Sequence, residues 1–321
     1  MGEFDLIARY FTRPVRRAAL GVGDDCALLR VAPGMQLAVS SDMLVAGRHF
    51  FDDVDPVHLG HKSLAVNLSD LAACGAKPLA FTLALSLPEA NEAWLKGFAE
   101  GLLTLADAHD IELVGGDTTH GPLNICITVF GEVPPGQALL RSGANPGDDI
   151  WVSGTLGDAR LALDALLGKI VLPPDALKAA RLRLECPTPR VALGMALRGI
   201  ANSALDISDG LLGDLTHILE QSQVGADIDA DATLQTMAAR KTALSLPDAQ
   251  WYQSALAGGD DYELAFTAPA EQRDQVLAAA KAADTPVTRI GRVTAAPGIR
   301  VLDAQGNPLS QQKWSSFDHF A

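Results

Sequence analysis

The sequence predicts a mixed α and β protein of two domains, and three observations support this fold class. Short β-type apolar runs alternate with helical patterns along the chain. The length of 321 residues and the 48% hydrophobic content exceed what one compact domain usually holds. Two turn-rich stretches, Val133 to Gly136 and Gly143 to Asp148, interrupt the pattern near its middle. We therefore expect one domain over residues 1–136 and a second over residues 137–321.

Strands and helices are expected in alternation. The segments with the length and composition of strands are Leu37 to Asp42, Phe81 to Leu87, Ile125 to Val133, Ile150 to Gly154 and Tyr262 to Thr267. Asp55 is a suitable helix cap and Pro56 suits the first helical position, and leucines then recur on one face up to Gly75. The other predicted helices are Glu89 to His109, Pro189 to Ile200, Leu211 to Gln221 and Ala270 to Ala283.

The charge balance limits the kinds of ligand. The formal net charge is −14, with 39 acidic and 25 basic residues, so a nucleic acid partner is not expected. An anionic ligand such as ATP would need divalent cations between its phosphates and the carboxylates of this chain. The start is acidic at Glu3 and Asp5, unlike a signal peptide, and no apolar run is long enough for a membrane span. We expect a cytoplasmic protein with no membrane partner.

Acidic residues recur beside Gly, Ser or Thr, each time near an apolar segment. The clusters lie at Gly21 to Ala27, Leu37 to Asp42, Asn67 to Gly75, Leu113 to Gly121, Leu205 to Asp214 and Gly258 to Leu264. Each cluster taken alone is explained equally well as a polar turn or a helix cap. Several carboxylates near one point repel one another unless cations lie between them, and such oxygen ligands suit Mg²⁺ held jointly with substrate phosphates. The recurrence therefore predicts a nucleotide bridged by Mg²⁺.

Four positions are individually suited to binding a metal ion or a phosphate. Asp42 ends an apolar strand, where open α/β sheets present ligand groups, and Asp70 has apolar neighbours, which favours a cation as its partner. The double glycine before Asp117 lets backbone amides approach an anion. The guanidinium of Arg141 is suited to clamping phosphate oxygens, although a solvated arginine is an equal interpretation. The P-loop, zinc-protease and serine-hydrolase motifs are absent from the sequence, which disfavours those classes.

Read in order, the motifs resemble the thiamine-monophosphate kinase family, within the aminoimidazole-ribonucleotide synthetase-like ATP-binding proteins. The resemblance runs nearly end to end and rests on GVGDDCA, SSDMLVAGRHF, AVNLSDLAACGAKP, GGDTTHGP, RSGANPGD, DISDGL, GGDDYEL and the terminal FDHF. It implies a two-domain α/β fold in which the N-terminal sheet forms a dimer barrel and the C-terminal domain is an α/β sandwich. The N-terminal domain would bind ATP and Mg²⁺ and form the homodimer, and the C-terminal domain would complete the nucleotide and substrate sites.

The resemblance also implies roles for individual residues. The implied Mg²⁺ ligands are Asp25, Ser40, Ser41, Asp42, Asp70, Asp117, Asp206 and Asp209, of which Asp42, Asp117 and Asp209 are the implied catalytic residues. The implied nucleotide contacts are Gly116, Asp117, Arg141 and Ser208, and the implied substrate contacts are His49, Asp260 and Trp314. The family commonly has Glu where this chain has Asp260, and either Trp314 or Phe317 would cover the substrate ring.

The activity that the resemblance implies is the ATP-dependent phosphorylation of thiamine monophosphate to thiamine diphosphate, the last step of thiamine diphosphate biosynthesis. An acceptor phosphate is already ionised at neutral pH, so the reaction needs no general base, in keeping with a sequence rich in metal ligands. Two alternatives stay open at this point. One is the ATP-dependent cyclo-ligase or dehydratase chemistry of the same superfamily, and the other is a non-catalytic nucleotide-binding regulator.

Overall fold

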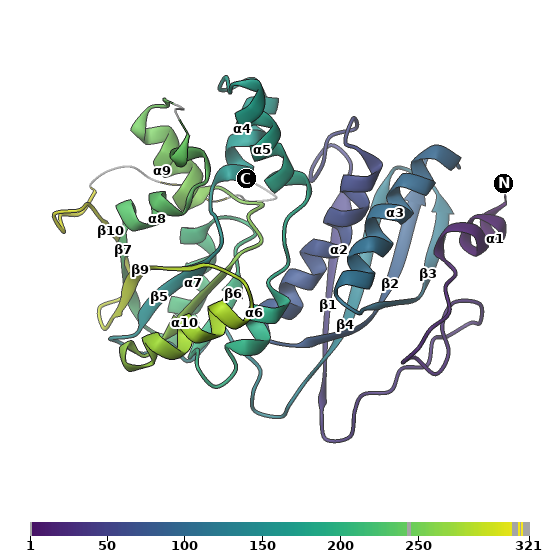
Figure 1. Ribbon diagram of the computed structural model, residues 1–321, viewed down its shortest axis with the longest axis horizontal. Coiled ribbons are helices and arrows are strands. Elements are labelled where there is room, and N and C mark those ends of the chain that lie inside the picture. The colour runs from purple at the N-terminus through teal and green to yellow at the C-terminus, as the bar shows by residue number, and fades with distance from the viewer. Residues whose placement is uncertain (1, 243–244, 310–313, 315, 317–321) are drawn as a thin grey trace. The chain divides into compact units, whose positions relative to one another are not determined.

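The chain divides into two compact units of mixed α and β structure (Figure 1). A computed structural model describes residues 2–242, 245–309, 314 and 316. The first unit comprises Met1–Leu71 and Ala76–Gly136, and the second comprises Ala72–Gly75 and Gln137–Ala321. No helix in the described ranges is long and apolar enough to cross a membrane. The predicted two-domain mixed fold is confirmed, and each unit has its own sheet.

The first unit is a four-stranded sheet with helices against it. Its elements are α1 (Glu3–Leu6), a π-helical turn (Ile7–Phe11), β1 (Gln36–Val45), α2 (Pro56–Ala73), β2 (Lys77–Leu87), α3 (Glu92–Ala108), β3 (Glu112–His120) and β4 (Asn124–Val133). The strand order is β1-β4-β2-β3, in which only β2 and β3 run parallel. β3 is thus an edge strand, and its residues after the double glycine are partly open to solvent.

Helices α2 and α3 pack together on this sheet (Figure 1). The predicted apolar face of α2 is buried, since Leu64, Leu68 and Leu71 are at most 1% exposed. A Cβ on Gly60 would lie 2.1 Å from the Phe98 carbonyl oxygen, so the two helix backbones touch. This close packing fixes the position of α2, which carries Asp70 toward β1.

The second unit is a six-stranded sheet with more helices. Its elements are β5 (Asp149–Ser153), α4 (Asp158–Leu166), α5 (Pro174–Glu185), α6 (Val191–Ala196), β6 (Ser203–Asp206), α7 (Leu211–Ser222), β7 (Gly225–Asp229), α8 (Ala230–Thr236), a 3-10 turn (Ala239–Lys241), α9 (Asp248–Ala257), β8 (Leu264–Ala268), a 3-10 turn (Ala270–Gln272), α10 (Arg273–Ala282), β9 (Val287–Thr294) and β10 (Gly298–Leu302). The strand order is β10-β7-β9-β5-β8-β6, with only β10 and β7 parallel.

The central strands of this sheet are covered on both faces. Every residue of β5 and β8 is buried. Ile150 and Val152 join the core cluster that α7 supplies, whereas Trp151 stacks on Phe266 across the strand pair at 6.4 Å. This buried framework supports the end of β6 and the loop that follows it, where the predicted metal ligands Asp206 and Asp209 lie.

Most predicted elements are present, with differences that have local causes. The last predicted strand begins at Leu264 because Tyr262 has a φ of +49°, which a strand cannot accommodate. The helix predicted over residues 189–200 is shortened to Val191–Ala196. The helix predicted from Glu89 begins instead at Glu92, because the side chain of Asn91 caps it by accepting the amides of Ala93 and Trp94.

Candidate functional site

Strand β1 presents its polar residues on two opposite faces. Ser40 and Asp42 are half-buried on the face that meets α2, and the Asp42 amide donates to Asn67 Oδ1 at 3.1 Å. Ser41 is exposed on the other face, where its hydroxyl donates to the Ile127 carbonyl at 3.1 Å. The strand period of two thus places only Ser40 and Asp42 beside Asp70.

Asp42 and Asp70 form a pair of carboxyl groups between β1 and α2. The Ser40 hydroxyl donates a hydrogen bond to Asp70 Oδ2. Burial raises the pKa of Asp42 to about 7, with further contributions from the charge of Asp70 and from the hydrogen bond between the two side chains. Since two close carboxylates cannot both ionise cheaply, the pair holds a proton near neutral pH when no cation is present.

The donor chemistry of this pair fits Mg²⁺. Two carboxylates and a hydroxyl oxygen are hard ligands, and Mg²⁺ is commonly held by one or two carboxylates together with water and substrate phosphates. The described residues contain no group of three or more His, Cys, Asp or Glu placed to hold an ion. Mg²⁺ that is held by two carboxylates takes its remaining ligands from water and substrate phosphates.

Asp117 lies on the edge strand β3, just after a local irregularity. The β2–β3 register shifts between Phe81 and Thr82, and Asp117 then pairs with Ala84 and is exposed. Gly116 has a φ of +147°, and a Cβ there would lie 1.8 Å from the Leu83 carbonyl oxygen. The glycine is thus required by the strand pairing itself, whatever it contacts in addition.

The loop of Asp25 is a surface hairpin with a buried anchor. Residues Leu20 and Leu28 form an antiparallel bridge at its base, and Asp25 is exposed at its tip. Before the loop, the carboxylate of Glu112 accepts the backbone amides of residues 16, 17 and 18 at 2.7 to 3.2 Å. Burial acts to raise the pKa of Glu112, but these amides and the Arg17 guanidinium hold it below its usual value.

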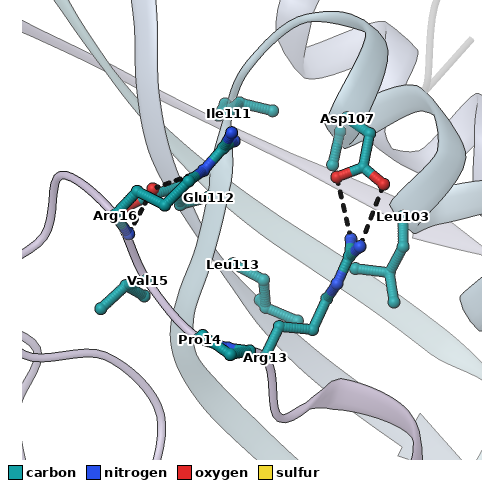
Figure 2. A pocket seen from close by; sticks show the side chains of 10 residues that line it. Arg13, Pro14, Val15, Arg16, Leu103, Asp107, Ile111, Glu112 and Leu113 are labelled. Carbon is teal, nitrogen blue, oxygen red and sulfur yellow. Dashed lines mark hydrogen bonds and ion pairs between the residues drawn. The ribbon is translucent and has the colours of Figure 1, made fainter.

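Figure 2 shows the cavity beside this anchor, where Arg16 reaches Glu112 and Arg13 forms a paired contact with Asp107. The cavity has a volume of about 390 Å³ and lies against the residues that precede the Asp25 loop. Its charged groups neutralise one another, since both Arg13–Asp107 hydrogen bonds are 3.0 Å long. We therefore regard this cavity as part of the anchor of the N-terminal segment.

His49 lies in the turn that follows β1. Its Nδ1 accepts the Val45 amide at 3.0 Å, and its backbone carbonyl accepts from Lys62 Nζ at 3.5 Å. An Nδ1 that accepts a hydrogen bond places the proton of the neutral ring on Nε2. His49 is therefore oriented by β1 itself, only a few residues beyond Asp42.

In the second unit, one group of predicted residues lies at the end of β6 and on the loop that follows it. Asp206 ends that strand, opposite Leu264 of β8. The next amides, those of Ser208, Asp209 and Gly210, all donate to Asp214 Oδ2 at 3.0 to 3.1 Å. One buried carboxylate thus determines the shape of the loop that carries Ser208 and Asp209.

Asp214 was not identified as a site residue from the sequence, although its motif was. Burial raises the pKa of Asp214 to about 6, and the charge of Asp209 adds to this, although the three amide hydrogen bonds act in the opposite direction. The sequence feature that could have indicated this role is an acidic residue in the first turn of a helix that begins after a glycine. A carboxylate at that position can accept the backbone amides before the helix, which have no partner within it.

The loop of Asp260 is joined to the same segment. The Asp260 amide donates to the Ser208 carbonyl at 2.8 Å, and the Tyr262 amide donates to the Ile207 carbonyl at 2.8 Å. Asp260 and Tyr262 have φ values of +66° and +49°, an uncommon conformation for residues other than glycine. The structure therefore brings a predicted nucleotide contact and a predicted substrate contact together by a direct hydrogen bond.

Two buried acidic residues, Asp261 and Glu263, hold the backbone of the Asp260 loop in place. Both carboxylate oxygens of Asp261 accept the Gly157 amide, and burial raises the pKa of Asp261 well above its usual value. Glu263 is fully buried and is bound by Arg190 through two 2.6 Å hydrogen bonds and by Arg183 at 2.9 Å. These supports could not be told apart from Asp260 in the sequence, because successive residues of this acidic motif face in opposite directions and, of its acidic residues, only Asp261 and Glu263 are buried.

The remaining predicted residues are on or near the surface of the second unit. Arg141 is exposed, and its carbonyl accepts from the Ser222 hydroxyl at 3.5 Å. Trp314 is half-buried against the core of this unit, with its ring 6.4 Å from that of Tyr252. Phe317, the other candidate for covering the substrate ring, lies outside the described residues.

Comparison with known proteins gives the class first. Residues 23–133 match the family described as AIR synthase related protein, N-terminal domain, and residues 145–304 match its C-terminal domain. The chain is therefore a two-domain protein of the AIR synthase related class. Two crystal structures of hydrogenase maturation protein HypE, at 22% identity and a TM-score of 0.74, share this fold.

The chain belongs to the thiamine-monophosphate kinase family. It is 46% identical to the thiamine-monophosphate kinase of Salmonella typhimurium, over 100% of this chain and 98% of the relative. The enzyme of that name from Haemophilus influenzae is 42% identical over the same shares. The crystal structure from Stenotrophomonas maltophilia has a TM-score of 0.84 and 48% identity, covering 95% of this chain and 96% of the other. A structure described as AaThiL complexed with AMPPCP and TMP has a TM-score of 0.74 and 30% identity over 92% of both chains.

Proposed function

We propose that this chain transfers the γ-phosphoryl group of ATP to the phosphate of thiamine monophosphate, forming thiamine diphosphate and ADP. The observation that carries this proposal is the Asp42–Asp70 carboxyl pair, in a chain 46% identical over its full length to a thiamine-monophosphate kinase. A related structure is described with AMPPCP and TMP, and AMPPCP is a non-hydrolysable form of ATP. The proposal includes a cytoplasmic location, where ATP is supplied.

The proposed Mg²⁺ ligands are those that the family resemblance implies, with Asp42 and Asp70 best supported by their mutual geometry. Bound Mg²⁺ would neutralise phosphate charge so that two anions can approach each other. Ser40 holds the carboxylate of Asp70, and Asn67 holds the backbone at Asp42. Ser41 has the weakest support, since its hydroxyl faces away from this pair and donates to Ile127.

The chain's own contribution to the chemistry is positioning and electrostatics. The acceptor is a phosphate already ionised at neutral pH, so no side chain has to remove its proton. In our proposal Asp42, Asp117 and Asp209 are the catalytic carboxylates, and Gly116, Asp117, Arg141 and Ser208 contact the nucleotide. His49, Asp260 and Trp314 contact thiamine monophosphate, whose cationic ring suits an acidic and aromatic surrounding.

We also propose that the chain forms a homodimer through the outer face of β1. Three apolar side chains of that face are about half exposed, namely Leu37 (47%), Val39 (56%) and Met43 (53%). They alternate along one strand, on the face that also carries Ser41, and a monomer rarely leaves several large apolar side chains of one face uncovered. Sedimentation of wild type and of Val39→Lys tests this, and the variant should be displaced toward the monomer. A wild-type chain that sediments as a monomer at micromolar concentration would refute it.

The activity is tested by incubating the purified chain with ATP, Mg²⁺ and thiamine monophosphate and separating the products by chromatography. We expect thiamine diphosphate and ADP in equal amounts. Formylglycinamidine substrates serve as a control for the cyclo-ligase chemistry of the superfamily. Turnover of that substrate without formation of thiamine diphosphate would overturn the proposal, and so would ATP binding without any turnover.

A further inference from the structure

The carboxylate of Asp214 is placed to hold a loop rather than a ligand. It lies in the first turn of α7 and is 6% exposed. Its Oδ2 accepts three consecutive backbone amides, those of Ser208 and Asp209 at 3.1 Å and that of Gly210 at 3.0 Å. An oxygen already surrounded by three donors has little capacity left for a metal ion or a phosphate.

The loop that Asp214 holds has few alternative conformations. Gly210 has a φ of +124°, and a Cβ there would lie 2.7 Å from the carbonyl carbon of Ala257. The chain therefore passes close against the end of α9 in a geometry that only glycine allows. The converging amides need a compensating acceptor, and a charged carboxylate is the strongest that a side chain supplies.

The same loop supports the Asp260 segment. The carbonyl of Ser208 accepts the Asp260 amide, and the carbonyl of Ile207 accepts the Tyr262 amide, both at 2.8 Å. In return the Ile207 amide donates to the Glu263 carbonyl at 2.8 Å. A displacement of residues 207–210 would consequently move the Asp260 loop, whose positive φ values leave it little freedom to compensate.

We propose that Asp214 is a positioning residue for the kinase reaction. It fixes Ser208 and Asp209, and through the Ser208 carbonyl it also fixes Asp260, so that one buried carboxylate sets both the nucleotide side and the substrate side of this unit. The inference rests on the proposed function, because that function gives Ser208, Asp209 and Asp260 their roles. In this proposal Asp214 acts through these residues and contacts neither substrate itself.

The test compares Asp214→Ala and Asp214→Asn with a matched control, Asp148→Ala. Asp148 is 4% exposed in the same unit, and its Oδ2 accepts the Asn145 amide at 2.9 Å and Asn202 Nδ2 at 2.8 Å. Removing it also deletes a buried acceptor, but at a turn that carries none of the proposed contacts. Steady-state kcat and KM for ATP and for thiamine monophosphate are measured well below the thermal midpoint of each variant.

We expect Asp214→Ala to lower kcat at least tenfold and to raise both KM values. Asp214→Asn should recover part of this loss, because its carbonyl oxygen can accept the same amides. Asp148→Ala should lose thermal stability while its kcat stays within twofold of wild type. If the alanine variant does not fold, Asp214→Asn decides alone. Folded Asp214 variants with kcat and both KM values within twofold of wild type would overturn the proposal.

Calorimetric binding of AMPPCP with Mg²⁺ separates this inference from the proposed function. A wild-type chain that binds AMPPCP but makes no thiamine diphosphate refutes the function alone. The positioning role is then judged by AMPPCP affinity, which should fall at least fivefold in Asp214→Asn and stay unchanged in Asp148→Ala. Equal affinity of wild type and Asp214→Asn would refute the positioning role, and a wild type that binds no AMPPCP refutes both.

Discussion

Replacing Asp42 by Asn should make the metal-free protein more stable above neutral pH while removing its activity. Burial and the neighbouring Asp70 raise the pKa of Asp42 from 3.8 to about 7. A carboxyl group whose pKa is higher in the folded state binds protons more tightly there, so stability falls as pH rises from about 4 to about 7. Asn has the same shape without a charge to desolvate, so the variant should lack this loss.

The size of the effect follows from the pKa. A rise from 3.8 to about 7 corresponds to about 4 kcal/mol, and since Asp42 shares its proton with Asp70 we expect about 2 kcal/mol or more to be recovered. At about 3 °C for each kcal/mol, the midpoint of the transition that includes the first unit should rise by about 6 °C or more. Thiamine diphosphate formation should fall on the order of 100-fold.

The assay is thermal unfolding with EDTA at pH 5 and pH 8.5, and again with Mg²⁺. At pH 5 the carboxyl group is protonated, so wild type and Asp42→Asn should unfold at similar temperatures. At pH 8.5 the variant should be more stable in EDTA, and only wild type should gain stability from Mg²⁺. Ser41→Ala is the control, because its side chain lies on the opposite face of β1 and its effect should not change with pH. A variant no more stable than wild type at pH 8.5 in EDTA would refute the reasoning.

Three further substitutions test supports of the site by urea unfolding. Gly116→Ala should lower the free energy of unfolding by about 3 kcal/mol, because the new Cβ would lie 1.8 Å from the Leu83 carbonyl oxygen and the φ is +147°. A loss below about 1 kcal/mol would show that β3 can shift to accommodate the methyl group. Glu112→Ala should lower the free energy of unfolding by about 3 kcal/mol, because three backbone amides lose their acceptor, and it should weaken the activation of the enzyme by Mg²⁺. Unchanged activation by Mg²⁺ would show that Glu112 does not position the Asp25 loop. Arg190→Ala should lower the free energy of unfolding by about 3 to 5 kcal/mol, because buried Glu263 loses the guanidinium that binds both of its carboxylate oxygens. An unchanged stability would show that Arg183 alone is enough to stabilise the charge of Glu263.

The sequence could predict those parts of the fold and site that depend on neighbouring residues. The short apolar run that begins at Leu37 and the leucine face of α2 predict β1 and α2, and the capping pattern predicts where α2 begins. The nearness of Asn67 and Asp70 on one helix face follows from their spacing, and both groups interact with the Ser40–Asp42 segment of β1.

The parts that sequence reasoning missed depend on distant partners or on glycine geometry. Strand β3 was not predicted because its double glycine is typical of a loop, yet here the glycines allow close pairing with β2. Glu112 holds amides 94 to 96 residues away in the sequence, and no local pattern indicates such a contact. Asp261 and Glu263 lie one and three residues after Asp260 in the same motif, but the alternation that buries them becomes visible only once the positive φ values are known.

The pKa shifts separate two kinds of buried acid in this chain. Glu112 stays ionised without a cation, because backbone amides and the Arg17 guanidinium outweigh its burial and lower its pKa. The pKa of Asp42 shifts in the opposite direction, because burial raises it and the nearest charged group, the carboxyl of Asp70, raises it further. A carboxylate that accepts backbone amides holds the backbone in place. A carboxylate that lies beside another carboxylate is repelled by it and is stabilised by a bound cation. Asp214 combines both features, since three amides hold it beside Asp209, so it supports the backbone next to a residue with a proposed Mg²⁺ role.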